Sequence, residues 1–167
     1  MTVGIFDGVH RGHKALLERI VLHNADYSPV VITFLENHKV MNNEQRDIQS
    51  FRQRLEIFEK LGIQITIVID FSEQFRQMPG KEFLEIILKR GNAGFFAAGN
   101  NFRCGCGLDT CAAAIQEFFA ARSIPAEIIP EVMEGSLAVS SSRIREAIAS
   151  GDTALAKAML GRNQLFG

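Results

Sequence analysis

TVGIFDGVHRGH, residues 2–13, is the stretch that decides the fold of this 167-residue chain. It begins with a short apolar strand, expected over Thr2–Phe6, and enters a helix at Gly12, after which apolar residues recur with helical spacing to about His23. Gly8 permits a tight turn between the two, and Gly12 lets a ligand approach the backbone closely. A helix that starts directly after a strand presents unpaired N–H groups and a partial positive charge, so this turn favours phosphate.

Strands and helices continue to alternate along the rest of the chain. Apolar, β-branched runs predict strands at Pro29–Phe34, Ile63–Ile69, Gly94–Ala98 and Ala126–Ile129. Helical spacing, caps and stop signals predict helices at Ile48–Leu61 before Gly62, Gly80–Arg90 with Gly91 as its stop, Asp109–Arg122 with Asp109 as its cap, from Ser140 or Ser141 to Ala149, and from Asp152 to Leu160. The polar stretch Glu36–Asp47 is expected to be a mobile loop.

This alternation predicts an α/β fold, a Rossmann-like parallel sheet with helices on both faces, in a single domain over residues 1–167. Ligands of such sheets bind beyond the carboxyl ends of the strands. The loops expected to matter most are therefore Asp7–His13, the segment after Phe34, and Gly99–Asp109.

Composition and charge exclude several classes of protein. Apolar residues make up 47% and charged residues 22%, as in soluble globular proteins. The net charge of -1 gives no overall field that would recruit nucleic acid or an anionic membrane, so neither is expected as a partner. No apolar run approaches the roughly 20 residues needed to span a bilayer. With the first strand at Thr2 there is no room for a signal peptide, and the expected compartment is the cytoplasm. Oligomeric state is left open.

The cysteines Cys104, Cys106 and Cys111 are clustered and odd in number, unlike a secreted disulfide framework. Their spacing lacks a fourth zinc ligand, so we expect reduced thiols and no metal site. The remaining histidines, His23 and His38, are isolated and are expected at the surface.

Two histidines three residues apart, His10 and His13, flank Gly12 at the first helix start. Both can face one phosphate group and donate hydrogen bonds to charge that develops there, so they are the candidate catalytic residues. A second cluster is the serine run Ser140–Ser142, whose hydroxyls and N–H groups suit an anion. Arg145, one turn further on, can reach a phosphate with its guanidinium and is the third catalytic candidate.

The glycine-rich segment Gly99–Gly107 carries Asn101 and Phe102. An amide can bind the edge of a heterocycle and an aromatic ring can stack on its face. Taken alone, this segment is also compatible with an ordinary glycine-rich turn.

Together these residues resemble a known family. HRGH at residues 10–13 is similar to the HxGH signature of nucleotidyltransferases, and Gly4–His13 resembles the FAD synthetase module of bacterial bifunctional riboflavin kinase/FMN adenylyltransferases. The resemblance continues through Phe51–Gly62, Gly99–Gly105, Ser140–Arg145 and Gly151–Arg162, in order along most of the chain.

The resemblance implies transfer of AMP from ATP, with Mg²⁺, to FMN, giving FAD and pyrophosphate. It implies catalytic roles for His10, His13 and Arg145. It places ATP at Gly4, Phe6, Asp7, Gly8, His10, Gly12, His13, Ser141, Ser142 and Arg145, and flavin at Thr33, Asn101 and Phe102. The riboflavin kinase half of the family's bifunctional proteins is not expected in this chain.

The sequence also departs from the family pattern. Thr33–His38 lacks the two prolines of the usual T-F-x-P-H-P, Cys104 stands where phenylalanine is common, and Ser142 replaces a threonine. The phosphate-binding residues are thus intact while the acceptor loops differ. Two other functions stay open: a nucleotidyltransferase with a different phosphate-bearing acceptor, and a flavin- or nucleotide-binding module without catalysis.

Overall fold

A computed structural model of the chain describes residues 1–35 and 47–163. Its strands are β1 (Thr2–Val3), β2 (Val30–Phe34), β3 (Ile65–Ile69), β4 (Phe96–Gly99), β5 (Arg103–Cys104), β6 (Thr110–Cys111), β7 (Ala126–Ile129), β8 (Met133–Glu134) and β9 (Leu137–Ala138). Its α-helices are α1 (Arg11–Val21), α3 (Phe51–Lys60), α4 (Glu73–Arg76), α5 (Gly80–Gly91), α6 (Ala112–Ala120), α7 (Ser141–Ala149) and α8 (Thr153–Leu160), with a short 3-10 turn at Cys106–Leu108.

The central sheet has five parallel strands in the order β3-β2-β1-β4-β7. β1 lies in the middle, with Val3 opposite Ile32 of β2 and Thr2 opposite Ala97 of β4. The chain first builds outward from β1 to β3 and then returns to build β4 and β7 on the other side of β1. This arrangement confirms the predicted α/β, Rossmann-like fold. It also puts a topological switch point between β1 and β4, which is where such sheets bind ligands.

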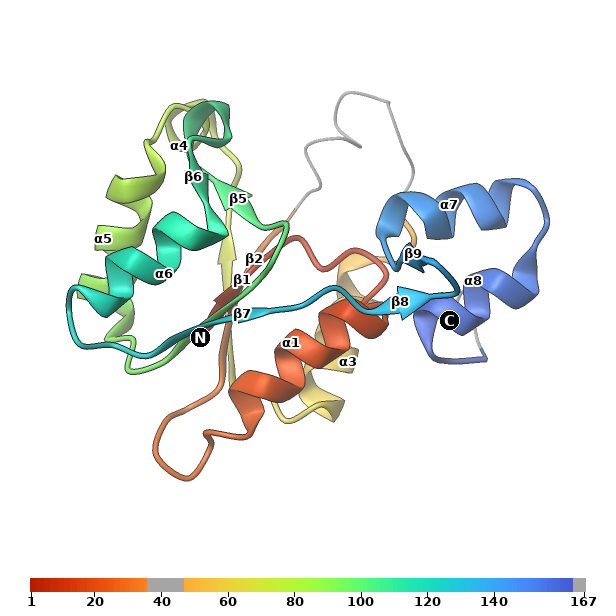
Figure 1. The fold of residues 1–167 in the computed structure, drawn as a ribbon, viewed down its shortest axis with the longest axis horizontal. Coiled ribbons are helices and arrows are strands. Elements are labelled where there is room, and N and C mark those ends of the chain that lie inside the picture. Colours follow the sequence, from red (N-terminus) through yellow and green to blue (C-terminus); the bar gives the residue numbers. More distant parts are fainter. Residues whose placement is uncertain (36–46, 164–167) are drawn as a thin grey trace.

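Helices cover both faces of the sheet, as Figure 1 shows, with α5 and α6 on one side and α1 and α3 on the other. Alternation along β2 explains the two layers, because successive side chains of a strand point to opposite faces. Ile32 belongs to the core formed with Phe83 and Phe119, whereas Val31 belongs to the core formed with Leu17. A strand buried on both faces reads as a continuous apolar run, as the VVITF of β2 does.

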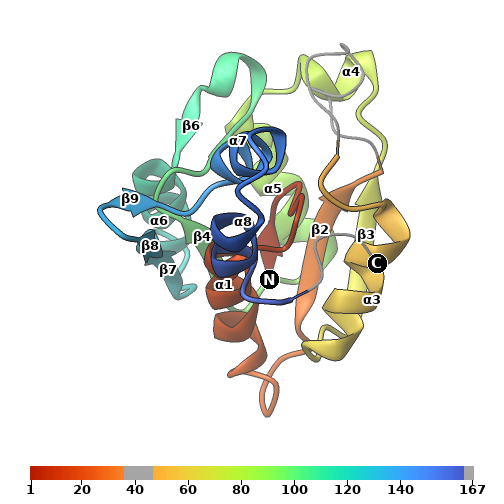
Figure 2. The same cartoon turned by 90° about the vertical axis from the view of Figure 1, so that its right-hand side faces the viewer.

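A third, smaller core joins α7 and α8, which pack against each other beside the sheet (Figure 2). It contains Ile144 and Met159 from the two helices and Ile48 from the segment before α3. Ser140 caps α7 and Asp152 caps α8, each by accepting a backbone N–H of the first turn. The caps thus fix where each helix begins, and the shared apolar core holds the two helices together.

Two predicted helix boundaries are wrong. Asp109 does not cap the helix that follows it, since α6 begins at Ala112. Instead, its carboxylate accepts the backbone N–H of Gly80 at 3.1 Å, at the start of α5. Gly91 is the last residue of α5 rather than its stop, and Asn92 takes the left-handed conformation with φ +46°.

The end of β1 and the exposure of His23 also differ from expectation. β1 ends at Val3 rather than at Phe6, because Phe6 has φ +55° and leaves the extended conformation. His23 is not a free surface residue, since its half-buried ring lies 3.9 Å from that of Phe95, centroid to centroid. His38 and residues 36–46 of the expected loop lie outside the described residues.

None of the helices in the described ranges combines the length and the apolar character that crossing a bilayer requires.

Candidate active site

A cleft of about 560 Å³ lies at the carboxyl ends of β1 and β4, at the switch point of the sheet. Four chain segments of functional interest line it: the β1–α1 loop (residues 4–10) with the start of α1, the loop after β4, the segment after β7, and the first turn of α7. Its size is typical of a small-molecule site. The first and third loops singled out from the sequence therefore meet in one place.

The β1–α1 loop has a strained backbone. Phe6, Gly8 and Val9 have φ of +55°, +83° and +34°. Positive φ is ordinary for glycine, but it is an outlier for a bulky or β-branched residue. Strain of this kind persists only where the surroundings hold it, and it is concentrated at functional sites. Here Phe6 and Val9 are both buried, which fixes the turn that leads into α1.

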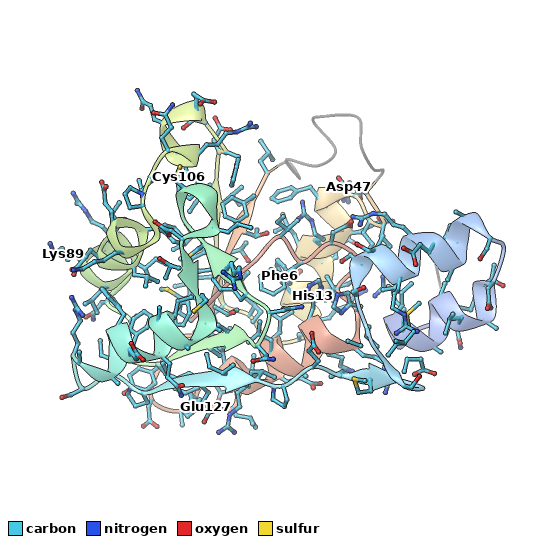
Figure 3. The ribbon with its side chains drawn as sticks, turned by 45° about the horizontal axis from the view of Figure 1, so that its top comes forward. Phe6, His13, Asp47, Lys89, Cys106 and Glu127 are labelled. Carbon is cyan, nitrogen blue, oxygen red and sulfur yellow. The ribbon has the colours of Figure 1, made fainter. Side chains whose placement is uncertain are left out.

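His10 and His13 lie at this helix start as a stacked pair. Their ring centroids are 3.6 Å apart with an interplanar angle of 17°, and the edge of Phe6 packs against His13 at 5.2 Å. Figure 3 shows Phe6 and His13 near the centre of the molecule, between the sheet and the α7–α8 pair. His10 is the N-cap, and its Nδ1 accepts the backbone N–H of His13 at 3.3 Å. A neutral His10 therefore carries its proton on Nε2, as a donor.

Both imidazoles are neutral at pH 7. Burial lowers the pKa of His10 to about 4, and the nearby charge of Arg162 adds to this effect. Burial also lowers the pKa of His13 well below its usual range, with His10 and Arg54 contributing. Each neutral imidazole therefore has one N–H to donate and one nitrogen that can accept a hydrogen bond.

Asp7 ties the β1–α1 loop to its surroundings. One carboxylate oxygen accepts the backbone N–H groups of Ile48 at 2.9 Å and Gln49 at 3.3 Å, and the other is ion-paired with Arg145. Burial raises the pKa of Asp7, while Arg145 and the two amides oppose that shift. Ser141 donates its hydroxyl to the Asp7 carbonyl at 2.9 Å. Arg145 and Ser141 line the cleft as expected, but each also anchors the loop to α7.

The other residues of the serine cluster divide into distinct tasks. Ser140 caps α7 by accepting the N–H of Arg143 at 3.3 Å. Arg143 in turn donates to the carbonyls of Leu137 and Ala138, so it holds the β8–β9 hairpin. Ser142 lines the cleft and is exposed, and its side chain makes no hydrogen bond with the described part of the chain. Its hydroxyl is available to a ligand.

The loop after β4 brings Asn101 and Phe102 into the cleft, as the sequence indicated. The side-chain amide of Asn101 donates to Glu131 at 3.5 Å, which connects this loop to the segment after β7. Cys104 also lines the cleft, and burial raises the pKa of its thiol to about 11. The thiol therefore stays protonated and acts as a small apolar surface.

Two expected site residues do not line the cleft: Thr33 and Gly8. Thr33 is fully buried in β2, and its hydroxyl donates to the Ile5 carbonyl at 3.3 Å. Gly8 contributes backbone geometry, with φ +83° and the side chain of Ile48 at 3.1 Å from the position of a Cβ. Both residues support the loop from behind.

Sequence reasoning missed the buried arginine Arg54, which donates to the carbonyls of Ile5 and Phe34 at the ends of β1 and β2. A signal for it exists: Arg54 falls on the apolar face of α3, between Phe51 and Phe58. A charge on such a face is informative because charged residues are almost never fully buried without partners.

An aromatic wall on the β2–β3 side of the cleft was also missed. It consists of Phe34, Phe71, Phe75 and Phe83, with successive ring centroids 5.2 to 5.8 Å apart. Contacts of this kind suit a flat aromatic ligand. The wall draws on β2, the segment between β3 and α4, α4 and α5, so no single sequence motif could reveal it.

Gly105 provides a test of the loop after β4. Its φ is +85°, and a Cβ there would lie 2.2 Å from the backbone nitrogen of Gly80. Gly107, two residues on, also has positive φ, but a Cβ there meets nothing within 4 Å. We expect Gly107→Ala to cost about 1 kcal/mol from the left-handed backbone alone, and Gly105→Ala about 3 kcal/mol because a backbone clash is added. Urea unfolding of both variants measures the difference, and equal costs would contradict the packing described here.

Comparison with known proteins places this geometry in a family. Residues 1–143 match the FAD synthetase family. Two curated relatives are bifunctional riboflavin kinase/FMN adenylyltransferases: that of Escherichia coli K12 is 26% identical over 96% of this chain and 53% of its own length, and that of Pseudomonas fluorescens is 28% identical with the same coverage. The chain spans about half the length of the curated relatives it matches.

A solved structure from Streptococcus pneumoniae, described as a macrolide-efflux protein, is also similar. It superposes with a TM-score of 0.83 and is 29% identical, covering 96% of this chain and 54% of its own. The family match covers every residue that lines the cleft except Arg145. The chain belongs to the FAD synthetase family.

Proposed function

We propose that this chain transfers AMP from ATP to FMN, giving FAD and pyrophosphate. The observation that carries the proposal is the stacked, neutral His10–His13 pair at the start of α1, in the switch-point cleft of a member of this family. A helix start with unpaired N–H groups favours phosphate, and two imidazole donors placed there can stabilise charge that develops during transfer.

In this proposal ATP lies with its phosphates between the start of α1 and the first turn of α7. His10, His13 and Arg145 act on the reacting phosphates, and Ser142 offers its hydroxyl from the opposite wall. The remaining ATP-site residues are Gly4, Phe6, Asp7, Gly8, Gly12 and Ser141, of which Asp7, Gly8 and Ser141 act by holding the loop. Mg²⁺ enters with the triphosphate, as is usual for this ion.

The chemistry is a single in-line displacement. An oxygen of the FMN phosphate forms a bond to the α-phosphorus of ATP. The bond from that phosphorus to the oxygen bridging to the β-phosphate breaks, and its electron pair leaves with pyrophosphate. The chain contributes position and charge stabilisation rather than a covalent intermediate.

The flavin ring lies in this proposal between the loop after β4 and the aromatic wall. Phe102 and the wall offer aromatic faces, and Asn101 offers an amide beside them. The cleft changes from polar at the start of α1 to apolar at this wall. That gradient matches FMN, which carries a phosphate at one end and a ring system at the other. Thr33 supports the ring-binding side from within β2.

One assay tests the function. Purified chain with ATP, Mg²⁺ and FMN is expected to form FAD and pyrophosphate in equal amounts, measured by chromatography and by the change in flavin fluorescence. AMP transfer to another phosphate-bearing acceptor such as phosphopantetheine, but not to FMN, would reassign the acceptor. Binding of FMN or ATP without pyrophosphate would indicate a binding module. Riboflavin in place of FMN is expected to give no FMN, because residues 1–167 are proposed to form the adenylyltransferase unit alone.

Replacing Cys104 with phenylalanine is expected to lower the Michaelis constant for FMN several-fold. Cys104 is half-buried on the acceptor side of the cleft, and an aromatic pair adds about 1 kcal/mol beyond area burial. Cys106→Phe is the matched control, because Cys106 is exposed and does not line the cleft. Steady-state kinetics with FMN as the varied substrate measures both. An unchanged constant in Cys104→Phe would place the flavin elsewhere.

A further inference from the structure

We propose that Arg162 is a positioning residue for His10. It binds the backbone carbonyls of Gly8 and Val9 in the β1–α1 loop and so orients His10 toward the reacting phosphates. The inference rests on the proposed function for its kinetic consequence. Its structural part concerns the free protein and can be tested without catalysis.

The chain reaches this loop from the end of α8. Gly161 ends the helix in the left-handed conformation with φ +66°, and a Cβ there would lie 2.9 Å from the side chain of Arg11. This turn brings Arg162 into contact with the β1–α1 loop. Its Nη2 donates to the Gly8 carbonyl at 2.7 Å, and its Nη1 donates to the Val9 carbonyl at 3.2 Å.

Gln49 binds both Arg162 and the same loop. With its amide oriented to satisfy both neighbours, Gln49 donates to the Gly8 carbonyl at 3.1 Å and accepts from Arg162 at 2.9 Å. Gly8 and Val9 are the residues whose φ is positive immediately before His10. Their carbonyls set the direction in which the chain enters α1, so the residues that bind them determine where the His10 ring points.

Charge supports the same role. Arg162 has no carboxylate partner among the described residues, so its positive charge acts on its neighbours. Arg162, which follows α8, lies near enough to His10 for its charge to act on the imidazole, and His10 also stacks on His13. Asp7 and Arg145 form an ion pair of their own. The charge of Arg162 lowers the pKa of His10 and keeps Nδ1 free to accept the His13 N–H.

Arg162→Met and Arg162→Lys separate position from charge. Methionine removes the charge and both carbonyl bonds, so we expect the pKa of His10 to rise, although burial, the larger cause, still holds it below its usual range. We also expect kcat for FAD formation to fall about 10- to 100-fold, with the Michaelis constant for FMN within about twofold, because the loss is one of alignment. Lysine retains the charge but not the two-pronged contact, so the His10 pKa stays near that of the parent while kcat falls.

The His10 pKa is measured by NMR titration of its ring protons in the free protein, assigned with His10→Asn. Arg143→Met is the matched control, because Arg143 also donates to two carbonyls but holds the β8–β9 hairpin. It is expected to leave the His10 titration unchanged. An unshifted His10 pKa in Arg162→Met, or parental kcat in Arg162→Lys, would overturn the proposal. If Arg162→Met does not fold, Arg162→Lys provides the test. Its kcat is expected to fall, while the acid limb of its pH profile is expected to stay at the parental pH.

Failure of the two proposals is distinguishable. A parent protein that makes no FAD contradicts the proposed function but leaves the His10 titration as a test of Arg162. Binding of a nonhydrolysable ATP analogue, weaker in Arg162→Lys than in the parent, then replaces kcat as the second measurement, and equal binding overturns the proposal.

Discussion

Replacing His13 with alanine is expected to lower the turnover number for FAD formation by about 100-fold or more. The reason is the loss of one preorganised donor at the point where charge develops, for which about this factor is typical. His13 stacks on His10 and receives the edge of Phe6, so the substitution also removes the contact that orients the second histidine. Turnover at saturating ATP and FMN measures the effect.

The control must separate chemistry from folding. His23→Gln changes a histidine that follows the opposite end of α1 and packs against the ring of Phe95, away from the cleft. It is expected to keep turnover within about twofold of the parent, since its ring does not line the site. The melting temperatures of both variants report on folding. A His13→Ala protein that is folded and turns over at a near-parental rate would remove the histidine pair from the mechanism.

Replacing Asp7 is also expected to have a large effect on stability. Its carboxylate is 4% exposed, pairs with Arg145 and accepts two backbone N–H groups. Asp7→Asn keeps an oxygen for the amides but removes the negative charge that Arg145 contacts, and breaking one side of a buried ion pair costs about 3 kcal/mol. The free energy of unfolding in urea measures the loss.

An exposed pair provides the reference. Arg52 and Glu56 lie one turn apart on α3 with side chains 90% and 50% exposed, so Glu56→Gln is expected to cost under about 0.5 kcal/mol. A double variant of Asp7→Asn with Arg145→Met is expected to cost less than the sum of the two single variants, because each single substitution already removes the Asp7–Arg145 ion pair. Similar costs for Asp7→Asn and Glu56→Gln would show that the buried pair has no special role.

The β1–α1 loop could be predicted from sequence because its information is local. A strand, a glycine turn and two histidines at helical spacing lie within residues 2–13, and the structure places the histidines together at a helix start. Alternation of strands and helices likewise determined the fold class. The strand order was not available, because the return from β3 to the far side of β1 leaves no local mark.

The remaining parts of the site were hidden because they depend on contacts distant in sequence. Aspartate is a common helix cap, so Asp109 was expected to cap the helix that follows it. Instead, its carboxylate accepts the N–H of Gly80 at the start of α5, 29 residues earlier. Arg145 and Asp7 are 138 residues apart, so the sequence indicated only that Arg145 can bind phosphate. The structure shows that Arg145 also contacts Asp7 and connects α7 to the β1–α1 loop. Thr33 was expected at the flavin because the segment around it resembles the family pattern. In the structure its side chain is fully buried within β2.

The central place of β1 has a consequence for the order in which this protein folds. Thr2 pairs with Ala97, and Gly8 accepts a hydrogen bond from Arg162, which is 154 residues away. Contacts of such high sequence separation form slowly. The β1–α1 loop therefore takes its final shape late in folding, after the helices and hairpins whose contacts are local.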